Sequence, residues 1–190
     1  DFNEAISKDG YKLFLKKLYE YGFTVIQNCK TEMSSVEKIA KKIGYVRESI
    51  FGGLWSFESN EDKADSAYTQ EELRPHTDST YSNDAPGLQL LLCCHYKASG
   101  GESIMVDGFK IAEKIKNEKK EIYDLLTQIE VTGQYIGDGV FLKAKRPIFR
   151  VNSDNELIQV SFNNYDRAPF KFSEDKTKKF YEAIKEFDLI

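Results

Sequence analysis

Predicted strands dominate the middle of this chain and do not alternate strictly with predicted helices. Apolar stretches predict strands at residues 23–26, 88–96, 102–106, 148–151 and 157–162. The polar run Asn152-Ser153-Asp154-Asn155 separates the last two and makes them a β-hairpin. A doubly wound parallel sheet requires a helix between successive strands, so this order argues against one. We expect an α+β, mainly β fold, in the form of an antiparallel barrel or jelly roll with flanking helices.

Helices are predicted at the start, centre and end of the chain. Apolar residues recur at helical spacing in residues 9–22, 36–43, 109–115, 119–128 and 173–187. Gly22 and Gly44 are expected to end the first two helices, and Ser34-Ser35-Val36-Glu37 is a capping box for the second. Asp107 and Ser173 are expected N-caps of later helices, because short polar side chains accept hydrogen bonds from the first turn.

Length, hydropathy and charge limit the partners of this chain. Its 190 residues suit one domain, and 41% hydrophobic residues suffice for a core. No apolar run approaches the roughly 20 residues that a membrane helix needs. The formal charge of -4 argues against a phosphate-backbone partner. The chain opens at Asp1 without a leader or an initiator methionine, so we expect a missing N-terminal piece.

Three cysteines, Cys29, Cys93 and Cys94, lack the C-x-x-C spacing of zinc ribbons and thioredoxin-type sites. Neighbouring residues of a strand point to opposite faces, so Cys93 and Cys94 do not pair readily. We therefore expect buried thiols in a reducing compartment, either the cytoplasm or, in a eukaryote, the mitochondrion.

His76-Thr77-Asp78 is the candidate catalytic and metal-binding motif. In an extended segment, residues i and i+2 face the same side, so the imidazole of His76 and the carboxylate of Asp78 would project together. They would be two of the three ligands in the 2-His-1-carboxylate triad of non-haem Fe(II) oxygenases. On spacing alone, an ordinary surface pair of histidine and aspartate remains the alternative.

Five ordered motifs around this pair resemble those of one enzyme family. The motifs are RESIFGGLW at residues 47–55, YTQEELRPHTDSTY at 68–81, PGLQLL at 86–91, GGES with VDGF at 100–109, and NNYDRA at 163–168. Over about residues 20–190 the chain resembles the γ-butyrobetaine and trimethyllysine dioxygenases of the taurine dioxygenase superfamily. The resemblance implies a double-stranded β-helix (jelly roll), Fe(II) as cofactor, and 2-oxoglutarate and O₂ as co-substrates.

The resemblance also implies roles for individual residues. It assigns iron binding to His76 and Asp78, 2-oxoglutarate binding to Leu91 and Ser103, and substrate binding to Phe51, Trp55, Asp65, Tyr68, Asn163 and Asn164. Phe51, Trp55 and Tyr68 would form an aromatic cage around a trimethylammonium group, which cannot donate a hydrogen bond and is held by cation–π attraction. The other three substrate residues would lie near the substrate's other polar end. Phe51 and Trp55 as plain core aromatics remain the alternative.

The resemblance places a third iron ligand, a distal histidine, and an arginine that binds 2-oxoglutarate beyond Ile190. We therefore expect residues 1–190 to be one catalytic domain with its C-terminal part missing and an incomplete iron site. His95 lies where the family pattern has no ligand, so we expect it to be structural or to face solvent.

The expected activity is an Fe(II)- and 2-oxoglutarate-dependent dioxygenase that hydroxylates a trimethylammonium substrate, in carnitine biosynthesis or related betaine metabolism. The anionic Asp65 suits the α-ammonium of trimethyllysine better than the lone carboxylate of γ-butyrobetaine, which favours the former. Two alternatives stay open: a taurine-dioxygenase-like enzyme with another small substrate, and a non-catalytic jelly-roll binding module. The expected partner is a small molecule rather than nucleic acid or a membrane, and a homodimer is compatible with the sequence.

Overall fold

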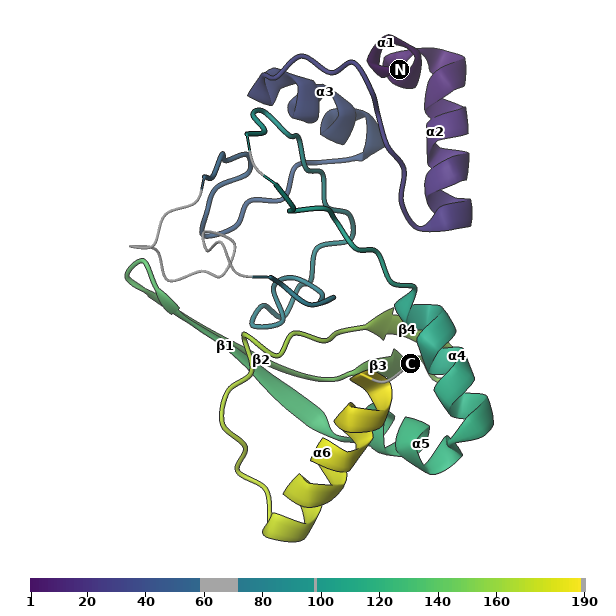
Figure 1. Ribbon diagram of the computed structural model, residues 1–190, viewed down its shortest axis with the longest axis vertical. Helices are drawn as coiled ribbons and strands as arrows, with labels where there is room; N and C mark the ends of the chain where they lie inside the picture. The colour runs from purple at the N-terminus through teal and green to yellow at the C-terminus, as the bar shows by residue number, and fades with distance from the viewer. Residues whose placement is uncertain (59–71, 98, 189–190) are drawn as a thin grey trace. The chain divides into compact units, whose positions relative to one another are not determined.

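The computed structural model describes residues 1–58, 72–97 and 99–188 (Figure 1). The chain divides into two compact units, the first made of Asp1–Glu58 and Gly87–Gly101, the second of Ser59–Pro86 and Glu102–Ile190. Each unit has a hydrophobic core of its own. The single catalytic domain expected from the sequence stays a prediction.

Three helices form the first unit. They are α1 (Phe2–Ile6), α2 (Lys8–Tyr21) and α3 (Met33–Ile43). One buried residue from each, Ala5, Phe14 and Ile39, makes up the centre of its core. The hydroxyl of Tyr11 on α2 donates a 2.6 Å hydrogen bond to the carbonyl of Lys42 on α3. The helices predicted at residues 9–22 and 36–43 are confirmed.

The ends of α2 and α3 test the capping predictions. Ser7 is the N-cap of α2, and its hydroxyl accepts a 3.1 Å hydrogen bond from the backbone N–H of Gly10. Gly22 ends α2 in the left-handed region (φ 75°), where a residue without Cβ is unstrained. The capping box predicted at Ser34 is wrong, because Ser34 lies inside α3 and the N-cap is Glu32, which makes no side-chain cap bond.

Three helices and two antiparallel hairpins make up the second unit. The helices are α4 (Gly108–Glu118), α5 (Lys120–Gln128) and α6 (Glu174–Asp188). The strands are β1 (Glu130–Gly137), β2 (Val140–Pro147), β3 (Phe149–Val151) and β4 (Leu157–Val160), paired β1 with β2 and β3 with β4. The later helices, the β3–β4 hairpin and the caps are confirmed: Asp107 and Ser173 accept hydrogen bonds from the N–H groups of Lys110 and Lys176.

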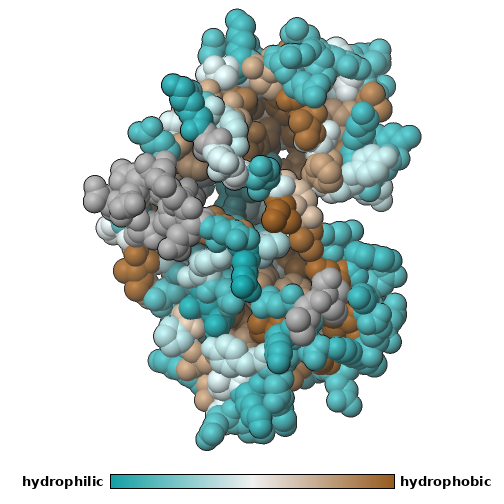
Figure 2. Space-filling view, viewed as in Figure 1, coloured by the Kyte–Doolittle hydropathy of each residue, from teal (hydrophilic) through white to brown (hydrophobic). Residues whose placement is uncertain are grey.

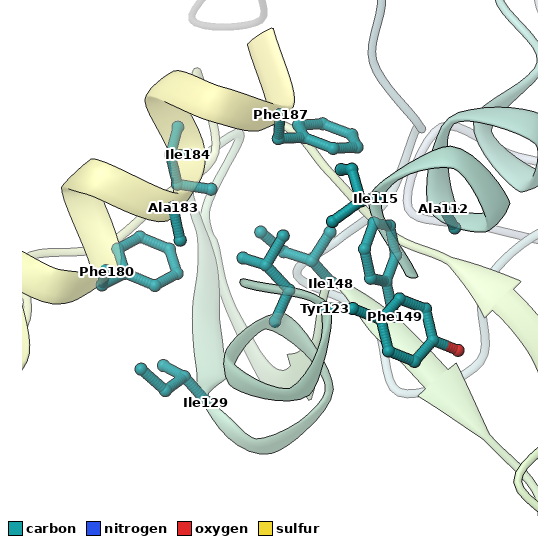
Figure 3. Close-up of a cluster of buried hydrophobic side chains, with 11 residues drawn as sticks. Ala112, Ile115, Tyr123, Ile129, Ile148, Phe149, Phe180, Ala183, Ile184 and Phe187 are labelled. Atoms are coloured by element: carbon teal, nitrogen blue, oxygen red, sulfur yellow. The ribbon is translucent and has the colours of Figure 1, made fainter. Parts of the chain in front are cut away.

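A hydrophobic cluster holds the second unit together (Figure 3). Its buried members come from α4, α5, the β2–β4 region and α6: Ala112, Ile115, Tyr123, Leu126, Ile129, Ile148, Phe149, Phe180, Ala183, Ile184 and Phe187. Phe149 is fully buried, and its ring lies 5.4 Å from that of Tyr123 and 5.8 Å from that of Phe187. Aromatic contacts thus join β3 to both α5 and α6.

The β1–β2 hairpin is absent from the sequence prediction. Its register runs from Glu130 opposite Pro147 to Gly137 opposite Val140. The two loop residues, Asp138 and Gly139, have φ values of 49° and 76°. A two-residue hairpin turn with positive φ at both positions favours Asp-Gly, because few other residues tolerate that conformation. This dipeptide is the signal in the sequence that identifies the hairpin.

The strands predicted at residues 23–26, 88–96 and 102–106 are wrong, because none pairs with another strand in the described part of the chain. Many of their large apolar side chains are exposed, with Leu91 at 68% and Ile104 at 66%, although Ile26 and Leu90 pack against the core of the first unit. Figure 2 shows hydrophobic residues reaching the surface on the face drawn. Apolar sequence does not by itself make a strand, since the backbone ladder needs a partner that is distant in sequence.

The prediction of buried cysteines is wrong because the strand predicted at residues 88–96 does not form. Cys93 and Cys94 are exposed and Cys29 is partly buried, so the expected buried thiols are not observed. Both exposed cysteines lie in residues 88–96, which pack into no sheet within the described ranges. His95 in this segment is exposed, which agrees with a solvent-facing residue.

The fold class is confirmed only in its α+β character. The described residues form two two-stranded sheets and no closed barrel, so this part of the chain is richer in helix than the mainly β fold that the sequence predicted. Among the same residues, no helix has the length and apolar character that crossing a membrane requires.

Candidate metal and substrate site

His76 and Asp78 lie side by side in the second unit. The Nε2 atom of His76 is 3.3 Å from Oδ1 of Asp78. The segment pairs with no strand among the described residues, and the predicted approach of the two side chains is observed. The His76 side chain is 23% exposed and that of Asp78 41%, so solvent reaches the pair.

The protonation state of His76 is set by its two neighbours. Its Nδ1 lies 2.7 Å from the carbonyl oxygen of Arg74, which can only accept, so Nδ1 carries a hydrogen and Nε2 faces Asp78. The hydrogen bond with Asp78 raises the pKa of His76 from 6.5 to about 8, against the opposing effect of burial; Arg74 and the charge of Asp166 also raise it. A neutral ring would therefore present the Nε2 lone pair beside a carboxylate.

Backbone contacts to the segment after β4 hold this motif in place. The N–H of Thr77 donates to the carbonyl of Phe162 at 2.7 Å, and the N–H of Phe162 donates to Oγ1 of Thr77 at 2.9 Å. The N–H of Arg74 donates to the hydroxyl of Tyr165 at 3.1 Å, and the ring of Tyr165 meets His76 edge-on at 6.1 Å. Thr77 thus points away from its two neighbours and anchors the segment from which they project.

Asp166 links the motif to the predicted substrate residue Asn163. Its Oδ2 accepts hydrogen bonds from Oγ1 of Thr80 at 3.1 Å and from Nδ2 of Asn163 at 3.0 Å. Asn164 is held separately, since its Oδ1 accepts from Nε of Arg167 at 3.0 Å. The structure therefore places both asparagines in the same unit as His76. Asp166 was missed in the prediction of site residues, although it lies in the NNYDRA motif.

A small cavity of about 20 Å³ opens beside these residues. Apolar residues of β1 and α6, together with Ile148 and Phe162, line part of it. Its polar lining consists of Thr80, Thr132, Arg146, Ser161, Asn163, Asn164 and Arg167. Arg146 and Arg167 are absent from the predicted site. No local motif marks Arg146, and only its alternation with the inward-facing Ala144 along β2 points to its burial.

The remaining predicted residues are spread over both units. In the first unit, the rings of Phe51 and Trp55 lie 5.7 Å apart, and Trp55 is 46% exposed, so it is not a core aromatic. Leu91, also in the first unit, and Ser103, in the second, are exposed, and their role in binding 2-oxoglutarate stays a prediction. Asp65 and Tyr68 lie outside the described residues.

His76 and Asp78 suit a metal ion by donor type and spacing. Two adjacent ligands about 2.1 Å from a metal are about 3.0 Å apart, close to the observed 3.3 Å between their ligand atoms. Within the described residues, however, no group of three histidine, cysteine, aspartate or glutamate side chains is arranged to hold a metal. These two residues would supply part of a coordination shell.

A family model described as taurine catabolism dioxygenase TauD, TfdA family, matches residues 1–190. The chain belongs to this TauD family. The family uses Fe(II) and 2-oxoglutarate and implies a jelly-roll fold. The resemblance seen in the five sequence motifs is thereby confirmed.

Curated proteins similar to this TauD-family chain include trimethyllysine and gamma-butyrobetaine dioxygenases. Trimethyllysine dioxygenase of Meyerozyma guilliermondii is 36% identical over 195 residues, covering 100% of this chain and 48% of the relative. The mitochondrial trimethyllysine dioxygenase of Homo sapiens is 33% identical over 167 residues, covering 85% of this chain and 40% of the relative. Gamma-butyrobetaine dioxygenase of Pseudomonas sp. is 32% identical over 174 residues, covering 92% and 45%. The chain spans about half the length of the curated relatives it matches.

Proposed function

We propose that the protein is an Fe(II)- and 2-oxoglutarate-dependent dioxygenase that hydroxylates a small trimethylammonium substrate. The observation that carries the proposal is the 3.3 Å approach of His76 Nε2 and Asp78 Oδ1, within a chain of the TauD family. An imidazole nitrogen and a carboxylate oxygen are two of the three protein ligands that non-haem Fe(II) oxygenases use.

His76 and Asp78 would hold the iron. When bound, Fe(II) would supply the activation of O₂ that couples decarboxylation of 2-oxoglutarate to substrate hydroxylation. The hydrogen bond from Nδ1 of His76 to the carbonyl of Arg74 fixes the tautomer that leaves Nε2 available. Asp78 contributes negative charge, and Thr77 keeps the segment in register with Phe162 through two hydrogen bonds.

The aromatic pair Phe51 and Trp55 supports a trimethylammonium substrate. Each π face contributes about 0.5–2 kcal/mol to binding a cation that cannot donate hydrogen bonds. The two rings lie 5.7 Å apart, and the exposure of Trp55 leaves part of its ring surface accessible to a ligand. We propose trimethyllysine over γ-butyrobetaine, since Asp65 would pair with its α-ammonium and three relatives named for trimethyllysine are 32–36% identical.

The experiment is a succinate-release assay of the protein with Fe(II), 2-oxoglutarate and ascorbate. The substrates are trimethyllysine, γ-butyrobetaine and taurine. We expect substrate-dependent succinate with trimethyllysine above γ-butyrobetaine and none with taurine. Asp78→Ala serves as the control, because it removes the anionic ligand while its exposed side chain contributes little packing.

Three results would point elsewhere. Turnover with taurine alone would mean an anionic substrate and would overturn the trimethylammonium proposal. Binding of trimethyllysine without any succinate release by protein loaded with Fe(II) would identify a binding module instead. Full activity of Asp78→Ala would show that Asp78 is not an iron ligand.

A further inference from the structure

Arg146 is a buried cation without a protein partner. It projects from the inward face of β2 and is 9% exposed. Its guanidinium makes no hydrogen bond or ion pair with any residue that the structure describes, and none of its nitrogens is sealed from solvent without a partner. Water or a bound ligand in the cavity must therefore supply the acceptors that this largely enclosed charge needs.

Polar side chains share the cavity wall with Arg146: Arg167, Asn163, Asn164, Thr80 and Ser161. The carboxylate of Asp166 lies behind this wall, where it accepts hydrogen bonds from Thr80 and Asn163. Arg167 is oriented by hydrogen bonds from Nε to Asn164 and from Nη1 to the hydroxyl of Tyr181 at 2.8 Å. Two guanidinium groups therefore contribute to one small cavity.

The surrounding charges do not neutralise Arg146. Burial lowers its pKa, and the positive charge of Arg150 lowers it further, whereas Asp84 acts in the opposite direction without forming an ion pair with it. A cavity of about 20 Å³ holds one or two water-sized groups, which is the size of a carboxylate head rather than of a whole metabolite.

We propose that Arg146, assisted by Arg167 and the amides of Asn163 and Asn164, forms a subsite that binds the carboxylate of a small molecule. A planar guanidinium binds a carboxylate through two parallel hydrogen bonds, which a water molecule cannot replace. The carboxylate would be that of the substrate, and in this identification alone the inference rests on the proposed function, since trimethyllysine and γ-butyrobetaine both carry one.

The first experiment uses acetate as probe, so that it does not depend on the proposed function. Thermal unfolding is followed with acetate up to about 100 mM, exchanged against chloride at constant ionic strength. We expect acetate to raise the unfolding temperature of the wild type and of Arg150→Met, which removes an exposed arginine from neighbouring β3. Arg146→Met should lose this response. Arg146→Lys keeps the positive charge but cannot donate two parallel hydrogen bonds to a carboxylate, so it should keep only part of the response.

Two outcomes of this experiment would overturn the subsite. One is an equal response to acetate in the wild type and in Arg146→Met. The other is no rise on exchanging chloride for acetate in the wild type, which would mean that the cavity does not select a carboxylate. If Arg146→Met does not fold, the acetate-induced rise in unfolding temperature is compared between Arg146→Lys and Arg150→Met. An equal rise in these two variants would likewise overturn the subsite.

The second experiment identifies the source of the carboxylate by calorimetry. γ-Butyrobetaine is compared with butyltrimethylammonium, which lacks the carboxylate. The wild type should bind γ-butyrobetaine at least about tenfold more tightly, and Arg146→Met should lose that preference while binding butyltrimethylammonium unchanged. Binding of acetate but of neither ammonium compound would refute the proposed substrate and leave the subsite standing. Binding of both without preference would refute the subsite as a substrate site and leave the proposed function standing.

Discussion

Replacing Gly133 by alanine should disturb the segment that carries His76 and Asp78. Gly133 lies on β1 against Thr80, two residues after Asp78. A Cβ at position 133 would lie 2.5 Å from the carbonyl carbon and oxygen of Thr80, where ordinary contact begins at 3.4 Å. The Thr80 backbone must therefore move by about 0.9 Å (3.4 minus 2.5), because neither contact is with a flexible side chain.

The expected cost follows from this overlap. Forcing extra volume into a packed position destabilises a protein by about 1–3 kcal/mol. The shift also strains the 3.1 Å hydrogen bond from Thr80 to Asp166, so we expect a loss in the upper half of that range. Because Asp78 lies on the same segment, binding of Mn(II), a spectroscopic substitute for Fe(II), should weaken by about tenfold.

Urea unfolding and Mn(II) titration followed by electron paramagnetic resonance measure the two effects. Gly87→Ala is the matched control, because a Cβ there meets nothing within 4 Å and its φ is not positive. It should change both quantities little. If Gly133→Ala keeps wild-type stability and Mn(II) affinity, the close approach of β1 to Thr80 is not part of the folded protein, and the reasoning fails.

Three further predictions concern the cage, the proton and the metal. Trp55→Leu should raise the apparent KM for trimethyllysine about tenfold but leave that for its tert-butyl analogue nearly unchanged, since only a cation uses the π face; equal losses would make the ring a plain apolar wall. In metal-free protein the raised pKa of His76, about 8 against 6.5, gives stability that is complete below pH 6.5 and lost as pH rises through 8. The free energy of unfolding in urea, measured below pH 6.5 and above pH 8, should differ by about 1 kcal/mol after solvent screening. His76→Gln should abolish this difference. Asp78→Ala should abolish protection of the protein by added Mn(II) against thermal unfolding, and retained protection would place the metal elsewhere.

Local signals in the sequence predicted most of the helices. Gly22 ends α2 and Asp107 begins α4, because capping depends on the backbone of a few neighbouring residues. The approach of His76 and Asp78 was predictable for the same reason, since an extended backbone places residues i and i+2 on one side without help from the rest of the fold.

The strand predictions show where local reasoning stops. Residues 88–96 are as apolar as a buried strand but form no strand among the described residues and are mostly exposed, whereas Glu130–Gly137 forms a strand that the prediction lacked. Apolar content is a property of one segment, but a ladder is a property of two, and its hydrogen bonds depend on where the second segment lies.

The composition of the candidate site shows the same division. The amino-acid sequence by itself determined the family motifs, the helix caps and the shared side of His76 and Asp78. Only the tertiary structure brought Asp166 against Thr80, 86 residues away in sequence, and enclosed Arg146 with Asn163 and Arg167. The physical reason is that a charge or a hydrogen-bonding group acquires its role from the groups around it, and packing between distant segments decides which groups those are.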